Sequence, residues 1–196
     1  MKRICVFCGS GRGSNEGYID AAKNLGLTLL KNKLSLVYGG ASVGLMGAIA
    51  NTCMENGGEV IGVIPKALFD REVACDNLTD LRVVNTMHER KALMAELSDG
   101  FIALPGGLGT IEEFFEVLTW GQLGIHGKPC GLLNIDGYYD RLIEFLDHTV
   151  DEGFVQKSCR SMILMDSNPD VLLQMMKSYR SPEVDKAKWA LEALQP

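Results

Sequence analysis

The sequence alternates short, continuously apolar segments with longer segments of helical periodicity, and this alternation constrains the fold more than any other feature. The apolar segments predict strands at 3–8, 34–38, 59–64, 81–84, 100–104, 129–134 and 161–165. Helical spacing predicts helices at 15–32, 45–55, 88–97, 110–123 and 138–150, and a last helix near 184–194. Strands that are apolar on both faces are typical of a parallel sheet covered by helices on both sides. We therefore predict an α/β fold, a single-domain, Rossmann-like, doubly wound and mainly parallel sheet of about seven strands.

The length and charge of the chain limit the classes of function. With 196 residues, the chain fits one domain at 1–180 followed by a C-terminal helical tail at 181–196. Lys and Arg number 19 against 25 Asp and Glu, a formal net charge of −6, which excludes a broad nucleic-acid surface but permits a local basic pocket. No segment approaches the roughly 18 apolar residues of a membrane span, and the apolar stretch after Arg3 is too short for a secretory signal. We expect a cytoplasmic protein that binds neither nucleic acid nor membranes.

Cysteine and histidine usage predicts neither a disulfide framework nor a metal site. The cysteines are scattered, mostly within apolar segments, and are expected to be reduced and buried: Cys5, Cys8, Cys53, Cys75, Cys130 and Cys159. Cys5 and Cys8 lie three residues apart on a predicted strand, so we expect them to point to opposite faces of the sheet. None of the three histidines is spaced to share a metal with another.

Three glycine-rich loops follow predicted strands, at 9–13, 39–44 and 105–110. Ligands of such sheets bind at the carboxyl ends of the strands, where these loops would lie together. None of the loops matches a dinucleotide fingerprint or a P-loop. Glycines allow backbone N–H groups to approach an anion closely, and a following helix adds its positive end. The alternative is that the glycines only make tight turns, but three loops at one edge favour a phosphoryl ligand.

Two interpretations of Glu113 follow from its place near the start of the predicted helix at 110–123. Thr110 and Glu113 have the spacing of a capping box, in which both serve only the helix end. Alternatively, a carboxylate in the first turn lies about one helical pitch, 5.4 Å, from a phosphate bound there, where the sugar of a nucleotide monophosphate would extend. Glu112 and Glu116 fit a solvated face equally well.

The segment 86–91 contains a second group of candidate residues. Thr86 and Glu89 have capping-box spacing, so Glu89 is interpreted as structural. Arg90 and Lys91 are unusual, because cations favour the last turn of a helix and not the first. Arg90 also shares a helical face with the apolar residues Leu93, Met94 and Leu97. An inward guanidinium needs an anionic partner, either Glu113 or a ligand phosphate, whereas an ordinary surface arginine would need none.

A long polar stretch, 65–80, follows the third predicted strand and contains Arg71 and Glu72. Loops of this length are uncommon within compact domains unless they have a function. A lid or substrate-contacting segment and a plain surface loop are both compatible with it.

The segment Pro105–Glu113 resembles the PGGxGTxxE signature of the Lonely Guy (LOG) family, the cytokinin riboside 5′-monophosphate phosphoribohydrolases, many of which were once labelled lysine decarboxylases. The resemblance extends over nearly the whole chain, at 7–10, 38–40, 44–47, 63–65, 87–91, 119–120, 131–134 and 136–139. Two positions depart from or vary in the pattern: Ala41 replaces the last glycine of a triplet, and Leu108 fills the variable position.

The resemblance implies hydrolysis of the N-glycosidic bond of adenosine-type 5′-monophosphates, plain as in an AMP nucleosidase or N6-prenylated, to free base and ribose 5-phosphate. It implies no metal or organic cofactor. It also implies a homodimer, which fits the apolar surplus on one helix at Phe114, Phe115, Leu118 and Trp120.

The essential Arg and Glu of the family correspond to Arg90 and Glu113, which the resemblance therefore implies to be catalytic. The substrate contacts it implies are Glu72, Arg90, Lys91, Gly106, Gly107, Leu108, Gly109, Thr110, Ile111, Glu112 and Thr119. A phosphate or ribose loop is a candidate role for Gly9, Ser10, Gly39 and Gly40.

Such a cleavage passes through an oxocarbenium-like state, which a carboxylate stabilises while it activates water. A helix N-terminus favours the ionised form of Glu113, whereas a bound phosphate raises its pKa, and the sequence does not rank the two effects. The source of the leaving-group proton is also open. Two alternatives are a phosphorylated-ligand binding protein such as a molybdenum-cofactor carrier, which resembles this family, and a nucleotide-sensing module. The presence of both Arg90 and Glu113 argues for the enzyme.

Overall fold

The computed structural model of the protein describes residues 1–69, 78 and 80–182. Glu72, Cys75 and the helix predicted near 184–194 therefore lie outside the described residues, as does most of the stretch at 65–80. Of the predicted tail, the structure describes only Ser181 and Pro182.

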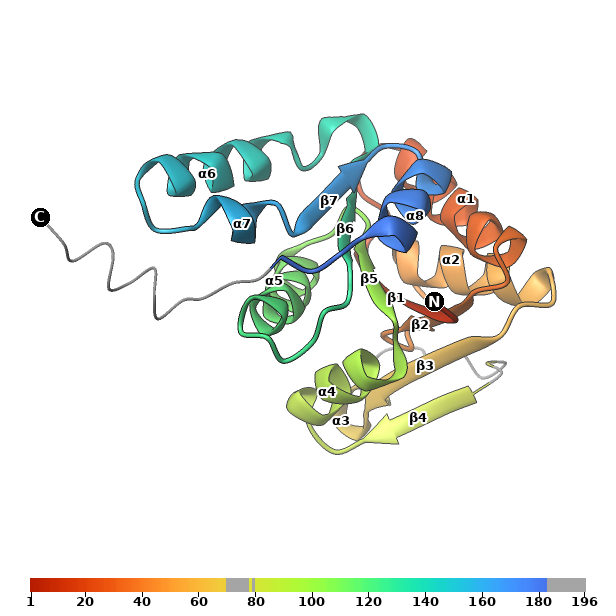
Figure 1. Cartoon of the computed structure of the whole chain (residues 1–196). Coiled ribbons are helices and arrows are strands. Elements are labelled where there is room, and N and C mark those ends of the chain that lie inside the picture. The colour runs from red at the N-terminus through yellow and green to blue at the C-terminus, as the bar shows by residue number, and fades with distance from the viewer. Residues whose placement is uncertain (70–77, 79, 183–196) are drawn as a thin grey trace, which may run out of the picture.

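Seven strands form one sheet in the order β4-β3-β2-β1-β5-β6-β7, and every neighbouring pair is parallel (Figure 1). The predicted doubly wound parallel sheet is confirmed. The strands are β1 (Arg3–Phe7), β2 (Ser35–Tyr38), β3 (Val60–Pro65), β4 (Asp80–Val84), β5 (Gly100–Ala103), β6 (Cys130–Leu133) and β7 (Ile163–Asp166).

Helices cover both faces of the sheet, each over its own apolar core. One core packs the sheet against α1 (Gly17–Lys31), α2 (Gly44–Glu55) and α8 (Pro169–Ser178). The other packs it against α4 (Met87–Leu97), α5 (Leu108–Gln122) and α6 (Asp140–Asp151). Cys5 belongs to the second core and Cys8 to the first, so the prediction that they point to opposite faces is confirmed.

The observed element ends agree with the predicted ones to within one or two residues, and the differences have local causes. Pro65 was expected to stop the third strand, but β3 includes it and pairs it with Val84. Pairing between β2 and β3 ends at Tyr38 and Gly62, so the missing N–H of Pro65 removes no ladder bond on that side. Three short helices were not predicted, because single turns give no periodic pattern: α3 (Lys66–Phe69), the 3₁₀ turn η1 (Ile135–Gly137) and α7 (Lys157–Arg160). For α8 no bounds were predicted.

The cysteines within the described residues are free and buried, as the sequence predicted for them. No three His, Cys, Asp or Glu side chains of the described ranges come together in a way that could hold a metal ion. Among the same residues, none of the helices is both long and apolar enough to cross a bilayer.

The strand order reverses between β1 and β5, which opens a crevice at their carboxyl ends. The glycine loops meet there through their backbones. Gly9 N donates to Pro105 O at 3.1 Å, which joins the first and third loops. A Cβ on Gly44, whose φ is +58°, would lie 2.2 Å from Ser10 O, so only glycine allows the second loop to approach the first.

Candidate active site

Helix α4 begins with the capping box that the sequence predicted. Thr86 Oγ1 accepts a hydrogen bond from Glu89 N at 3.0 Å, and the Glu89 carboxylate accepts one from Asn85 N at 2.8 Å. The structural interpretation of Glu89 is confirmed. This fixed first turn directs the next residue, Arg90, toward the sheet.

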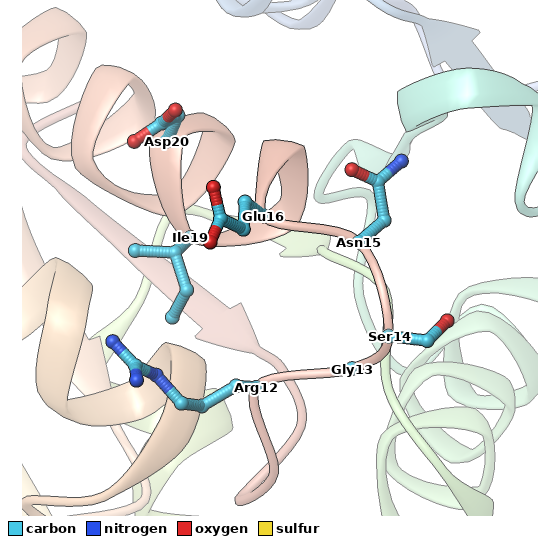
Figure 2. A pocket seen from close by; sticks show the side chains of 7 residues that line it. All are labelled: Arg12, Gly13, Ser14, Asn15, Glu16, Ile19 and Asp20. Carbon is cyan, nitrogen blue, oxygen red and sulfur yellow. The ribbon is translucent and has the colours of Figure 1, made fainter.

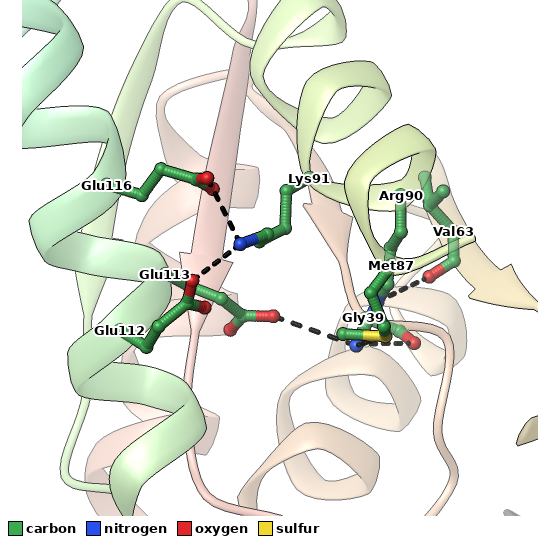
Figure 3. A network of polar contacts seen from close by, with 8 residues as sticks. All are labelled: Gly39, Val63, Met87, Arg90, Lys91, Glu112, Glu113 and Glu116. Carbon is green, nitrogen blue, oxygen red and sulfur yellow. Dashed lines mark hydrogen bonds and ion pairs between the residues drawn. The ribbon is translucent and has the colours of Figure 1, made fainter.

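The Arg90 side chain is buried at the carboxyl ends of β2 and β3, with 7% of the residue exposed (Figure 3). Its Nε donates to Val63 O at 3.1 Å and its Nη2 donates to Gly39 O at 3.0 Å. Its Nη1 lies 3.7 Å from Glu113 Oε1. The inward direction and the carboxylate partner were predicted. The two carbonyl acceptors were not, although their position at strand ends could have suggested them.

Gly39 makes room for this guanidinium. A Cβ at position 39 would lie 2.0 Å from Arg90 Nη2, so any other residue would displace the side chain. Gly40, with φ +83°, packs against Val63 and Ile64. Neither glycine lines the pocket that contains Arg90 and Glu113, although the sequence placed both in a candidate phosphate or ribose loop.

Helix α5 starts two residues earlier than the sequence indicated, and this changes the interpretation of Glu113. Its N-cap is Gly107, and no side chain caps it. Thr110 is buried inside the first turn, so the predicted capping box of Thr110 and Glu113 does not form and that interpretation is wrong. Glu113 lies in the second turn and not in the first, and its carboxylate faces Arg90 (Figure 3).

Burial raises the pKa of Glu113 above its ordinary value, and the charge of Arg90 opposes that shift only in part. The neighbouring carboxylates of Glu112 and Glu116 raise the pKa further, while Lys91 lowers it. Its side chain is only 12% exposed, so water screens these interactions little. The surroundings of the carboxyl group therefore shift its ionisation to higher pH than in water, a property found in groups that exchange protons during catalysis.

Lys91 connects α4 to α5. Its side chain is 10% exposed, and Nζ lies 2.5 Å from Glu112 Oε1 and 3.1 Å from Glu116 Oε1 (Figure 3). The solvated-face interpretation is therefore wrong for Glu116, whose side chain is only 25% exposed. Two carboxylates already compensate the Lys91 charge, and this joins the two helices that carry Arg90 and Glu113.

Arg90 and Glu113 share a cavity of about 250 Å³ with the start of α5. It is lined by Cys8, Gly9, Ser10, Met46, Arg90, Gly107, Leu108, Gly109, Thr110 and Glu113. The first intrahelical bond of α5 runs from Ile111 N to Gly107 O at 3.1 Å, so the amides of residues 108–110 have no acceptor within the helix. Free amides at a helix N-terminus, next to a buried guanidinium, suit an anionic group such as a phosphate.

The structure brings together only some of the predicted site residues. Thr119 faces a different groove, where its hydroxyl donates to Phe115 O at 2.7 Å. Ile111 and Glu112 do not line the cavity, and Gly106 lines an adjoining hollow. Sequence reasoning missed Met46 and treated Cys8 as purely structural, although both lie in segments that carry the family resemblance.

Two further hollows are lined by the glycine loops and by the start of α1. One is lined by glycines of the first and third loops together with Tyr18 and Tyr138. The other lies around Arg12, with Glu16 and Asp20 on its wall (Figure 2). Because these carboxylates face the same hollow as Arg12, it is less suited to an anion than the Arg90 cavity.

Comparison with known proteins places the chain in a family. The family model described as "Possible lysine decarboxylase" matches residues 46–176. The rice protein "Probable cytokinin riboside 5'-monophosphate phosphoribohydrolase LOGL2" (Oryza sativa subsp. japonica) is 49% identical over 198 residues, which cover 99% of this chain and 81% of the relative. An Arabidopsis thaliana cytokinin riboside 5'-monophosphate phosphoribohydrolase, LOG2, is 51% identical over 179 residues, 91% of this chain and 84% of the relative. The chain belongs to the LOG family.

Solved structures with the fold of this LOG protein include more distant proteins. The molybdenum cofactor binding protein of Rippkaea orientalis superposes with a TM-score of 0.67 at 22% identity, over 91% of this chain and 97% of that one. The molybdenum cofactor carrier protein of Chlamydomonas reinhardtii gives a TM-score of 0.68 at 21% identity, over 90% and 96% of the two chains. At this identity the likeness shows a shared fold alone.

Proposed function

We propose that this LOG-family chain is a phosphoribohydrolase that cleaves the N-glycosidic bond of adenosine-type nucleoside 5′-monophosphates, releasing the base and ribose 5-phosphate. The observation that carries the proposal is the buried Arg90–Glu113 pair, 3.7 Å apart, beside the uncapped N-terminus of α5. Relatives about half identical in sequence, named for this activity, support it. A carrier function has support only from the shared fold.

In this proposal the free amides of α5 bind the 5′-phosphate, and the ribose extends toward Glu113. Positive charge develops on the ribose as the bond to the base breaks. The Glu113 carboxylate stabilises that charge and activates the attacking water, whose proton it accepts. Arg90, fixed by two backbone carbonyls, holds Glu113 in place and opposes the rise of the Glu113 pKa. Because the pKa of Glu113 is raised by burial, its carboxyl group is also suited to return a proton.

The remaining substrate contacts belong to the same proposal. Gly107 to Thr110 surround the phosphate. Lys91 compensates the charges of Glu112 and Glu116. Glu72 contributes to ribose or base recognition. Thr119 lines the groove between α5 and α6–α7 and not the cavity of Arg90, so it contacts substrate only if a second copy of the chain brings it to a neighbouring site.

The test is to incubate the purified protein with AMP and with isopentenyladenosine monophosphate and to assay free base by chromatography. We expect base release from at least one nucleotide, and much slower release from adenosine, because phosphate binding energy positions the reacting carbon. Binding of the nucleotide without release of base would support a sensing or carrier protein and overturn the proposal.

A homodimer is part of the proposal, and an apolar groove between α5 and α6–α7 supports it. The groove includes Phe115, Leu118, Leu146 and Met162, and Phe145 nearby is 60% exposed. A second copy would cover this surface. Leu118→Asp should therefore convert a dimer to a monomer in light scattering, and a monomeric wild-type protein would contradict the assignment. We also propose a cytoplasmic location, since the free, buried cysteines suit a reducing compartment.

A further inference from the structure

The turn that follows β6 contacts the glycine loop at 105–110, and the proposed mechanism gives this turn no role. We name residues 136–139 the tyrosine turn. The Tyr139 hydroxyl donates to Leu104 O at 2.6 Å, and the Tyr138 hydroxyl donates to Gly106 O at 2.6 Å. Gly9 N donates to the carbonyl between them, Pro105 O, at 3.1 Å. Three consecutive carbonyl groups at the start of the loop are thus each held by a donor.

Side-chain bonds hold the tyrosine turn itself. Asp136 and Gly137 adopt left-handed conformations, with φ of 50° and 70°, an uncommon succession that makes the turn tight. Asn134 Oδ1 accepts from Tyr139 N at 2.8 Å. Asn15 Nδ2 donates to Asp136 Oδ2 at 2.7 Å, which ties the turn to the loop after β1. The two tyrosines therefore extend from a fixed base toward residues 104–107.

The direction of the held carbonyls determines where the amides of the loop point. In a planar trans peptide the C=O and N–H groups point in opposite directions. Gly106 O points to Tyr138, which lines the hollow shared with Tyr18, so the N–H of Gly107 points away from that hollow. Gly107 also lines the cavity of Arg90 and Glu113, which neither Tyr138 nor Gly106 lines. The hydrogen bond of Tyr138 thus turns this amide toward the cavity.

The Tyr139 hydroxyl holds a peptide group two positions earlier in the chain than the one held by Tyr138. The last residue pairs of β5 are Ala103 with Phe7 of β1 and Ala103 with Leu132 of β6, so Leu104 O lies beyond the paired residues of both neighbouring strands. The Tyr139 hydroxyl, on a residue only 2% exposed, provides the donor that the sheet no longer supplies. Gly106 then packs so closely on Thr110 that a Cβ would lie 2.1 Å from Thr110 Oγ1. The start of α5 is therefore set by contacts on both sides of the loop.

We propose that Tyr138 and Tyr139 are positioning residues for phosphate recognition: they fix the peptide planes of 104–107 so that the first amides of α5 converge on the phosphate of the substrate. This inference rests on the proposed function for its substrate, but the geometry of the loop is independent of the chemistry at Glu113.

The test compares a nucleotide with its nucleoside. Tyr138→Phe removes one hydroxyl from a residue that is 41% exposed, so the fold should persist. We expect kcat/KM for AMP to fall about 10- to 100-fold, the cost of small misplacements in an oriented site, while kcat/KM for adenosine changes less than about 3-fold. The matched control is Tyr18→Phe, since the Tyr18 ring packs edge-on against Tyr138 but its hydroxyl donates to no described residue. Equal losses for AMP and adenosine, or no loss, would overturn the proposal.

A binding measurement separates this inference from the proposed function. If wild-type protein releases no base from AMP or from isopentenyladenosine monophosphate, the proposed activity fails, and the role of the tyrosines is decided by calorimetric titration with ribose 5-phosphate. Binding weakened about 10-fold in Tyr138→Phe but not in Tyr18→Phe supports the inference. Unchanged binding in Tyr138→Phe, or no binding by wild type, contradicts it. Tyr139→Phe is examined only if its thermal melt shows a folded protein, because its hydroxyl is buried.

Discussion

At the residue scale, Arg90 and Glu113 form an ion pair whose two side chains are both largely buried. Their side chains are 9% and 12% exposed, so each would carry a large desolvation cost without the other. Arg90 also donates to two carbonyl oxygens, whereas Glu113, among the described residues, makes this one ion pair. The asymmetry makes the arginine a fixed group and leaves the carboxylate available to a substrate.

Replacing Glu113 by Gln should abolish base release and preserve the fold. The amide has nearly the same shape but carries no charge for the developing oxocarbenium and accepts no proton from water. Turnover of AMP and the circular dichroism spectrum measure the two effects. Glu144→Gln, on the exposed side of α6, is the control and should be active. Wild-type turnover in Glu113→Gln would contradict the proposed mechanism.

Replacing Arg90 by Lys should slow turnover by about 10- to 100-fold, because each charge-assisted hydrogen bond contributes roughly 1.5–3 kcal/mol and an ammonium cannot reach both carbonyls and Glu113. Steady-state kinetics with AMP measure the loss. Arg82→Lys, in an ion pair with Asp80 whose side chains are both 40% exposed, is the matched control and should be neutral.

Gly39→Ala tests whether the position of Arg90 matters without changing Arg90 itself. The new Cβ would lie 2.0 Å from Arg90 Nη2 and displace the guanidinium. The substitution should slow turnover as Arg90→Lys does. Near wild-type rates in both variants would show that the position of Arg90 is not needed for catalysis.

At the element scale, the first turns of α4 and α5 determine the geometry of the site. The capping box of α4 holds the turn that carries Arg90, and Lys91 then links α4 to Glu112 and Glu116 on α5. Helix α5 has no side-chain cap, which leaves its amides free for a ligand. The capped helix α4 thus positions the side chains of the site, while the uncapped helix α5 has backbone N–H groups that can bind a ligand.

Removing a cap should affect stability and activity differently at two helices. Thr86→Ala and Asn168→Ala each delete an N-cap acceptor, in α4 and α8 respectively. Each should cost about 1 kcal/mol, a drop in Tm of about 2–4 °C for a chain of this size. Only Thr86→Ala should also lower turnover, because α4 carries Arg90 and α8 lies away from the site. Equal activity of the two variants would show that the α4 cap serves stability alone.

At the scale of the whole molecule, the buried carboxyl group couples folding stability to pH. Burial raises the pKa of Glu113 above the ordinary value of 4.5, so the folded protein binds its proton more tightly than the unfolded chain does. The associated stability is fully present below pH 4.5 and is lost as the pH rises through the folded pKa.

In Glu113→Gln this pH-dependent loss is absent. The free energy of unfolding of the variant, relative to wild type, should therefore increase as the pH is raised from about 4 toward neutrality. Urea denaturation at a series of pH values measures the difference. A difference that is constant with pH would mean that the Glu113 pKa is the same in the folded and unfolded protein.

The sequence by itself determined the fold class, the approximate element ends and the inward direction of Arg90. These properties follow from patterns within one segment: apolar runs define buried strands, and helical spacing places Arg90 on the face of Met94. The capping box at Thr86 was predictable for the same reason, since its two partners are three residues apart.

Only the tertiary structure decided the start of α5 and the chemistry of Glu113. The sequence Thr110–Glu113 has the same spacing as the real capping box, but Gly106 packs against Gly9 and Thr110, and the helix begins at Leu108. The two carbonyls that hold Arg90 belong to Val63 in β3 and to Gly39 just after β2, which are 27 and 51 residues away in the chain. The direction in which the Glu113 pKa shifts depends on burial and on charges from two helices. These effects come from different parts of the chain, so the sequence of one segment does not predict the shift.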